Sequence, residues 1–226
     1  GTNRRQRQMC IRDSWGVDTE MFRPLDIENE QENRNFTEIR TRFGAVSPGS
    51  KLLLAVGRLA ARKGYGTLIR GFSALNKEMP NTKLVIVGRG HLKRRLMRLA
   101  KSLGVGEDIT IESSLSFAEL AQLYRSSDLV VYPSFYEGQG LIPLEAMASG
   151  VPVVTVDHGP LPEMVDESVG ALFTMGNIES MVSVMKEVLK AGRKKGEKGR
   201  ARVLQKFTYS GNAESFENIY LEAINR

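Results

Sequence analysis

Cysteine is almost absent from the 226-residue chain, which has Cys10 alone. A single cysteine excludes an internal disulfide framework and is typical of a reducing compartment, so we expect a cytoplasmic location. The chain has only two histidines and no convincing cluster of metal-ligating residue types. No apolar run approaches the roughly 20 residues that a membrane-spanning helix needs, and no secretory signal pattern opens the chain.

The chain also lacks an acidic excess. Its 32 Lys and Arg residues outnumber 26 Asp and Glu residues, which gives a net charge of +6. This balance permits anionic partners such as nucleic acid, a membrane surface or phosphorylated ligands, and a non-catalytic basic binding module centred on residues 190–206 is one alternative. A stacking platform for nucleic acid needs aromatic residues among the basic ones. The basic segments lack them, so we expect no nucleic-acid partner.

From Lys51 onward, strand-type runs alternate with segments of helical periodicity. The continuous apolar runs are typical of strands buried on both faces, and they read KLLLAVG, KLVIVG, DLVVYPS and VPVVTV. The alternation recurs at least five times. The sequence therefore predicts an α/β, Rossmann-like open parallel sheet with helices on both faces.

The two ends of the chain lie outside this alternation. Residues 1–48 are interpreted as leader and linker, with one short helix ending at Gly44. The substring MCIRDS resembles translated sequencing-adapter sequence, which raises the alternative that the first fourteen or so residues are an artefact of gene assembly. We expect the Rossmann-like domain over residues 49–207 and a last helix within residues 208–226.

Ligands of an open parallel sheet bind beyond the carboxyl ends of its strands, so the loops after the predicted strands are the candidate site. Arg58 and Lys63 follow the first strand and suit phosphate, as a guanidinium fork and a compact ammonium; ordinary surface cations are the alternative. Gly88 and Gly90 follow the second strand. Lys93 stands where a dinucleotide fingerprint would have its third glycine, so a simple tight turn is the alternative there.

The most specific stretch is SFYEGQGLIPLEAMASG, residues 134–150. Its glycines let backbone amides approach a ligand, and the helix predicted to begin near Ile142 directs free N–H groups at the same space. Glu145 is predicted in the first turn of that helix, where an acidic residue stabilises any helix by about 0.3–1 kcal/mol. Ser134 and Glu137 match a helix-capping box. Each glutamate thus has a structural alternative, but the pair on a Gly-rich turn after a buried strand favours a binding site.

Several motifs, in order, resemble the donor-binding half of retaining glycosyltransferases of family 4, which have the GT-B fold. WGVDTEMFRP resembles the interdomain segment of that family, VGRLAARKG its first phosphate motif and VGRGHLKRRL its second glycine turn. The stretch from AELAQLYRSSD to MASGVPVV is similar to its most characteristic block, with Glu137 and Glu145 as the E-x7-E pair. The segment DHGPLPEMV resembles its last turn.

The resemblance implies roles for the matching residues. Arg58 and Lys63 would bind the diphosphate of a nucleotide sugar and stabilise the leaving nucleotide. Glu145 would accept hydrogen bonds from the ribose, and Glu137 would face the transferred sugar as a candidate nucleophile, with front-face and double-displacement mechanisms left open. The other implied donor-binding positions are Gly57, Gly88, Gly90, Ser114, Gly138, Gln139, Gly140 and Leu141. No cofactor and no metal are implied, and a UDP-, GDP- or ADP-linked donor is left open.

The acceptor-binding domain that precedes WGVD in this family is missing. We therefore expect a fragment that binds a nucleotide sugar weakly and does not transfer sugar at a normal rate, because the cleft needs both walls. For the whole protein, the resemblance implies a sugar, lipid or polysaccharide acceptor and peripheral contact with the inner membrane face. We expect Phe216, Ile219 and Tyr220 of the last helix to form exposed apolar surface. An NAD(P)-binding oxidoreductase domain is the alternative enzyme class, disfavoured by the broken glycine fingerprint.

Overall fold

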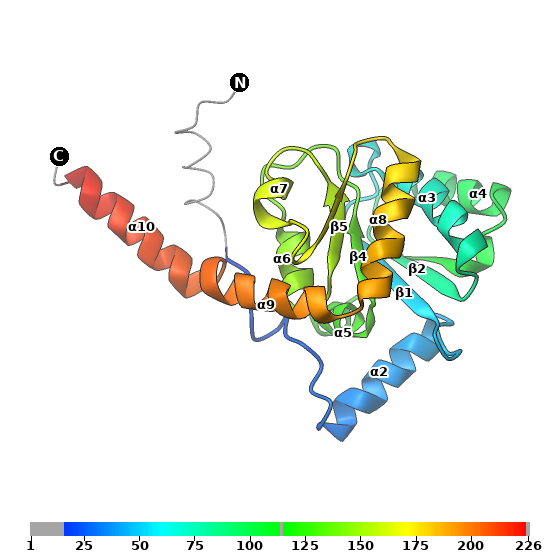
Figure 1. The fold of residues 1–226 in the computed structure, drawn as a ribbon, viewed down its shortest axis with the longest axis horizontal. Coiled ribbons are helices and arrows are strands. Elements are labelled where there is room, and N and C mark those ends of the chain that lie inside the picture. Colours follow the sequence, from blue (N-terminus) through cyan, green and yellow to red (C-terminus); the bar gives the residue numbers. More distant parts are fainter. Residues whose placement is uncertain (1–15, 114, 225–226) are drawn as a thin grey trace.

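Six parallel strands form one open sheet in the order β3-β2-β1-β4-β5-β6. The computed structural model describes residues 16–113 and 115–224, apart from some side chains of the last helix (Figure 1). The strands are β1 (Lys51–Val56), β2 (Thr82–Val87), β3 (Ile109–Glu112), β4 (Leu129–Tyr132), β5 (Val153–Val156) and β6 (Gly170–Phe173). Each neighbouring pair is parallel, so the predicted fold class is confirmed. The strand order reverses direction between β1 and β4.

Helices connect the strands and cover both faces of the sheet. They are α2 (Glu30–Arg42), α3 (Tyr65–Glu78), α4 (Lys93–Ser102), α5 (Phe117–Ser126), α6 (Leu141–Ala148), α7 (Leu161–Met164), α8 (Ile178–Ala191), α9 (Lys194–Lys206) and α10 (Tyr209–Ile224). α3 packs against α4 and α8, α6 packs against α9, and α2 packs against α5. The predicted capping box at the start of α5 is confirmed, since Ser116 and Glu119 each accept a hydrogen bond from the other's backbone N–H.

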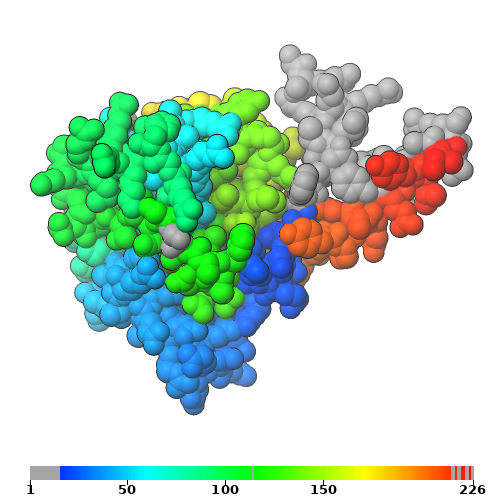
Figure 2. All heavy atoms as spheres, turned by 180° about the vertical axis from the view of Figure 1, so that it is seen from behind, coloured from blue at the N-terminus to red at the C-terminus, as the bar shows by residue number. Residues whose placement is uncertain are grey.

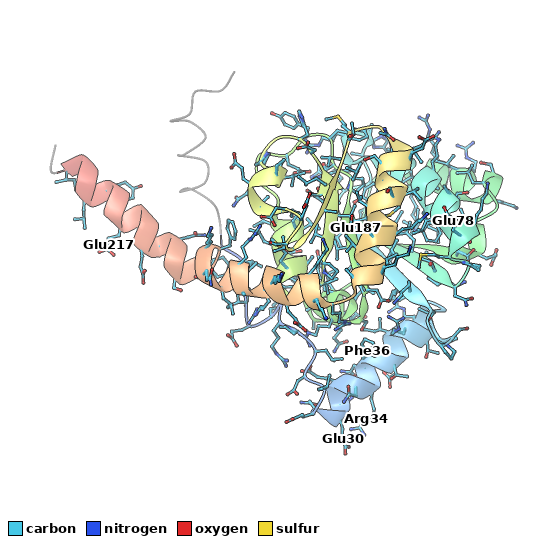
Figure 3. All side chains as sticks on the ribbon, in the orientation of Figure 1. Glu30, Arg34, Phe36, Glu78, Glu187 and Glu217 are labelled. Atoms are coloured by element: carbon cyan, nitrogen blue, oxygen red, sulfur yellow. The ribbon has the colours of Figure 1, made fainter. Side chains whose placement is uncertain are left out.

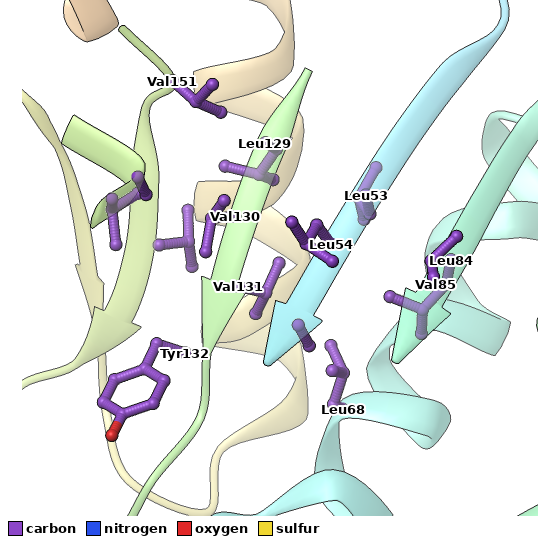
Figure 4. Close-up of a cluster of buried hydrophobic side chains, with 14 of the residues drawn as sticks. Leu53, Leu54, Leu68, Leu84, Val85, Leu129, Val130, Val131, Tyr132 and Val151 are labelled. Atoms are coloured by element: carbon purple, nitrogen blue, oxygen red, sulfur yellow. The ribbon is translucent and has the colours of Figure 1, made fainter. Parts of the chain in front are cut away.

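The core lies on both sides of the central strands (Figure 4). Leu53 and Leu54 of β1 point to opposite faces and are both fully buried, as are Leu84 of β2 and Val130 of β4. Burial of both faces explains why these strands are continuous apolar runs in the sequence. It also leaves the strand ends as the place where polar side chains can gather.

The segment 16–48, interpreted from the sequence as a linker, lies against the domain. Phe22 is buried and meets the Tyr124 ring edge to face, with the centroids 5.5 Å apart. Arg40 of α2 donates to Asp128 at 2.8 Å and to the Ser50 carbonyl at 2.8 Å. In Figure 2 the blue segment that contains α2 lies against the green segment that contains α5. Hydrogen bonds and an aromatic contact therefore tie this segment to α5 and to the neighbouring ends of β1 and β4.

The last helix stands apart from the sheet. Figure 1 shows α10 continuing away from the domain beyond α9. The side chain of Tyr220 is exposed, as are those of Leu221 and Ile224. Exposure is thus confirmed for Tyr220, whereas the side chains of Phe216 and Ile219 lie outside the described residues.

Two glycines in helices give opposite predictions for the same substitution. A Cβ on Gly196 of α9 would lie 2.0 Å from the Gly150 carbonyl oxygen, whereas a Cβ on Gly66 of α3 would have its nearest neighbour, Arg70 Nη1, at 3.4 Å. Gly196→Ala should lower the free energy of unfolding by about 1–3 kcal/mol through overpacking. Gly66→Ala should leave it unchanged or raise it by up to about 1 kcal/mol. Urea denaturation of both variants measures the difference, and equal effects would contradict the tight α6–α9 contact.

Candidate functional site

The loops after β1 and β4 meet at the point where the strand order reverses. The loop after β1 holds a short 3-10 helix, Ala61–Lys63, which ends at Gly64 in the left-handed region with a φ of 69°. Phe135 donates its backbone N–H to the Arg62 carbonyl at 2.8 Å, and a Cβ on Gly64 would lie 2.0 Å from the Pro133 carbonyl oxygen. Only glycine permits this approach, so Gly64 brings the two loops together.

Lys63 and Glu137, one from each loop, form an ion pair at this meeting point. Their side chains are only 12% and 15% exposed, and charges with so little exposure need partners. Ser134 also donates its hydroxyl to Glu137, and Lys63 Nζ lies 3.2 Å from the Tyr132 hydroxyl. Burial on its own would raise the pKa of Glu137, but hydrogen bonds from Lys63, Ser134 and Tyr132 outweigh it and lower that pKa. Glu137 is therefore held as a carboxylate.

The structural alternative for Glu137, a capping box with Ser134, is wrong. The next helix, α6, begins at Leu141, after Gly140 at its N-cap, and the Ser134 hydroxyl bonds to the Glu137 carboxylate. A capping box needs its serine at the N-cap and its glutamate three residues later, inside the helix. Glu137 therefore belongs to the loop, where its charge is available to Lys63.

Glu145 occupies the second turn of α6, so the prediction of a first-turn position is also wrong. The helix begins one residue earlier than expected, and no acidic residue lies in its first turn. Tyr124 of α5, which is fully buried, donates its hydroxyl to Glu145 at 2.7 Å. Burial raises the pKa of Glu145, and the hydrogen bond from Tyr124 partly opposes that shift. Glu145 is therefore not explained as an acidic residue that stabilises the start of the helix.

Arg58 is exposed at the end of β1 and forms no ion pair within residues 16–113 and 115–224. Gly57 before it has a φ of 137°. An arginine without a carboxylate partner beside the Lys63 loop can pair with an anion at modest desolvation cost. Its position suits the predicted phosphate role, which stays a prediction.

The chain's own backbone fills the space at two predicted glycines. A Cβ on Gly88 would lie 1.9 Å from the Gly57 carbonyl oxygen, and one on Gly90 would lie 2.4 Å from the Leu59 carbonyl oxygen. The loops after β1 and β2 are joined there by a hydrogen bond from the Leu59 N–H to the Arg89 carbonyl at 2.8 Å. The close packing of the two loops is therefore sufficient to require glycine at both positions, whether or not a ligand binds there.

The remaining predicted positions surround the start of α6. A Cβ on Gly138 would meet no atom within 4 Å, and the Leu141 side chain is 40% exposed. Gln139 lies between Gly138 and Gly140 in the same loop. Open space at Gly138 agrees with a backbone that a ligand can approach, whereas a Cβ on Gly140 would lie 2.9 Å from Met164 Cε, so packing against α7 already favours glycine there. Ser114, the other predicted position, lies outside the described residues.

Sequence reasoning missed the tyrosines of the site. Tyr132 ends β4, with its ring 5.4 Å from Lys63 Nζ, and Tyr124 lies in α5. Burial, with Glu137 nearby, raises the pKa of Tyr132, so its hydroxyl keeps its proton. Both tyrosines stood in segments that read as ordinary strand and helix. The available signal in the sequence for a site role of Tyr132 was its position directly after the last apolar residue of its strand.

Comparison with known proteins shows the class and then the family. The fold is shared with glycosyltransferases such as the sucrose-phosphate synthase of Thermosynechococcus elongatus, which is 25% identical, with a TM-score of 0.77, over 93% of this chain and 52% of that one. The C-terminal domain of LpcC, a glycosyl transferase group 1 family protein of Francisella tularensis, is matched at 25% identity and a TM-score of 0.72, over 85% of this chain and 99% of that one. Residues 37–203 match the model of the glycosyl transferases group 1 family, and the chain belongs to that family.

The curated relatives agree with this family assignment, and they are longer than the chain. The D-inositol 3-phosphate glycosyltransferase of Segniliparus rotundus is 31% identical over 92% of this chain and 46% of its own length. The mannosylfructose-phosphate synthase of Agrobacterium fabrum is 35% identical over 70% of this chain and 35% of its own. The chain thus spans half or less of these relatives. The oxidoreductase alternative receives no support. No described helix is long and apolar enough to cross a membrane.

Loss of the Tyr124 hydroxyl should destabilise the protein in a pH-dependent way. Tyr124→Phe removes the donor to a buried carboxylate, so the free energy of unfolding should fall by about 1–3 kcal/mol where Glu145 is ionised. The pKa of Glu145 is raised in the folded protein. The deficit should therefore shrink as pH falls through that pKa and Glu145 takes up a proton. Denaturation from acid to neutral pH measures it, with Tyr209→Phe at an exposed tyrosine as control. A deficit independent of pH would contradict the proposed link to Glu145.

Proposed function

We propose that the chain binds a nucleotide diphosphate sugar, as the donor-binding half of a retaining glycosyltransferase of family 4. The observation that carries the proposal is the meeting of Lys63 and Glu137 at the point where strand order reverses, where open parallel sheets bind their ligands. Arg58 adds a second cation at the same edge. The family assignment supplies the reaction class. We expect the whole protein to work in the cytoplasm on a sugar, lipid or polysaccharide acceptor.

Donor binding would change the partner of Lys63. A diphosphate offers several anionic oxygens and competes with Glu137 for the ammonium, while Arg58 approaches the same group. Glu137 would keep the Ser134 hydroxyl and gain capacity to accept hydrogen bonds from the hydroxyls of the donor sugar. Two cations on the diphosphate would also stabilise negative charge on the leaving nucleotide.

Glu145 would bind the other end of the donor. Its carboxylate has four lone-pair positions, of which the Tyr124 hydroxyl takes one. The others can accept from the two ribose hydroxyls. The chain would thus carry phosphate on cations and backbone amides, and hydroxylated rings on carboxylates. This division explains why a Gly-rich phosphate-type turn contains two glutamates.

Removal of the Lys63 charge should weaken donor binding specifically. In Lys63→Met, the dissociation constant of the preferred nucleotide sugar should rise by about 10- to 100-fold. This factor corresponds to the usual free energy of a hydrogen bond to a charged group. Lys83→Met is the matched control, because Lys83 pairs with Asp108 at 2.6 Å in another ion pair of limited exposure. Calorimetric titration with UDP-, GDP- and ADP-sugars and with NAD measures both variants. Preferential NAD binding by the unmodified chain would refute the proposal.

Donor affinity should also depend on pH through Glu145. Burial holds its pKa above the ordinary value of 4.5, and the protonated carboxyl is a poorer acceptor for ribose hydroxyls. Below that pKa the affinity should fall by up to about tenfold per pH unit. The pKa of Glu137 is lowered, so Glu137 stays ionised in this range. Glu145→Gln should bind more weakly and lose the pH dependence; an unchanged pH profile in that variant would assign the titration to another group.

A further inference from the structure

Two segments of the chain, residues 79–106 and residues 190–206, carry most of its excess positive charge. Residues 79–106 contain seven of the 32 Lys and Arg residues and none of the 26 Asp and Glu residues. Residues 190–206 also carry a charge of +7, from eight Lys and Arg residues against one Glu residue, so what distinguishes residues 79–106 is the absence of any acidic residue within the segment. The segment 79–106 consists of β2, α4 and the turns around them.

The cations of α4 form one exposed, uncompensated face. Arg94, Arg98 and Lys101 are exposed on successive turns, with Met97 between them at 38% exposure. Leu96 and Ala100 point inward and are buried. An open depression of about 990 Å³ lies along the first turns, lined by Gly90, His91, Lys93, Arg94, Met97 and Arg98.

No carboxylate neutralises this face in the part of the chain that the structure describes. Lys93 donates to the Ser113 hydroxyl at 2.6 Å and Arg89 to the Ser113 carbonyl at 2.8 Å, and both acceptors are neutral. Lys83, at the start of β2, is the only cation of the segment with a described ion pair, to Asp108. A cluster of cations without counter-charges produces a positive potential that attracts an anionic surface.

Several other helices of the protein carry paired surface charges. Three of the acidic side chains labelled in Figure 3 lie beside cations: Glu30 beside Arg34 at 3.6 Å, Glu78 beside Lys186 at 2.6 Å and Glu187 beside Lys195 at 3.4 Å.

The basic helix α9 likewise uses many of its charges internally. Arg202 pairs with Asp166 at 2.7 Å, and Arg200 donates to the carbonyls of Thr19, Phe22 and Ala148. Half of the eight cations in residues 190–206, where the sequence suggested a basic binding module, therefore have partners inside the protein. The face of α4 differs because no ion pair of Arg94, Arg98 or Lys101 is found among the described residues.

We propose that the exposed face of α4 binds an anionic membrane surface. Exposed cations that flank Met97, without carboxylates beside them, suit contact with anionic lipid headgroups. Nucleic acid fits less well, because residues 79–106 contain no Phe, Tyr or Trp on which bases could stack. The turn that precedes α4 touches the loop of Arg58 through the Leu59–Arg89 hydrogen bond. Membrane bound at α4 would therefore lie beside the candidate site.

Flotation with vesicles tests the proposal on the full 226-residue chain. The chain should bind phosphatidylcholine vesicles that contain phosphatidylglycerol and should not bind pure phosphatidylcholine. Raising the salt from about 0.1 M to about 1 M, which shortens the Debye length from about 10 Å to about 3 Å, should release it. The double variant Arg94→Glu/Arg98→Glu should bind at least about 30-fold more weakly, since each cation near such a surface contributes about fivefold.

Lys194→Glu/Lys198→Glu is the matched control, because it reverses two exposed cations on α9; it should bind vesicles almost as well as the unmodified chain. Both double variants should keep the unmodified melting temperature and nucleotide-sugar affinity, and Arg94→Gln/Arg98→Gln replaces the first if it fails to fold. Equal loss in the α4 and α9 variants would assign binding to net charge and overturn the proposal. So would absent vesicle binding, or binding of duplex DNA in preference to anionic vesicles. The proposal does not depend on donor binding, because vesicle binding and sugar-nucleotide titration fail independently.

Discussion

The candidate site depends on the contact between Lys63 and Glu137. The two residues are 74 positions apart in sequence, and they meet because β1 and β4 are neighbours where the strand order reverses. Gly64 permits the close approach of the two loops, and Ser134 and Tyr132 complete the environment of the carboxylate. Removal of one partner from an ion pair with so little exposure strongly destabilises the protein. The cation of the pair can nevertheless exchange one anionic partner for another. This property suits the proposed role of the site, which is to hold a dianionic diphosphate and release it.

The second glutamate is held by different physics. Among the described residues Glu145 has a hydroxyl partner and no cation, so burial dominates and raises its pKa, whereas Lys63 and two hydroxyls keep Glu137 ionised. Tyr124, which supports Glu145, also packs against Phe22 of the N-terminal segment. That segment is thus connected through a single aromatic side chain to the residue expected to bind the ribose.

Much of the fold could be predicted because the central strands are apolar on both faces and the helices between them keep their periodicity. The placement of Arg58, Lys63 and Glu137 on one edge followed from the same reasoning, since parallel strands all end there. The Lys63–Glu137 contact could not be predicted, because it depends on how closely the loops pack at Gly64. Tyr124 and Tyr132 were missed because the sequence shows only that they lie in buried elements, and not where their hydroxyls point. Gly88 and Gly90 look like phosphate-binding glycines in sequence, yet the backbone carbonyls of the neighbouring loop already require them.

The most direct test of the account is a crystal structure of the chain with its preferred nucleotide sugar. We predict that Lys63 Nζ and the Arg58 guanidinium lie within hydrogen-bond distance of the diphosphate, and that Glu145 accepts from the ribose. Glu137 should then face the sugar while still bonded to Ser134. A donor bound elsewhere, with the Lys63–Glu137 pair intact and Glu145 still bonded to Tyr124 alone, would contradict the account.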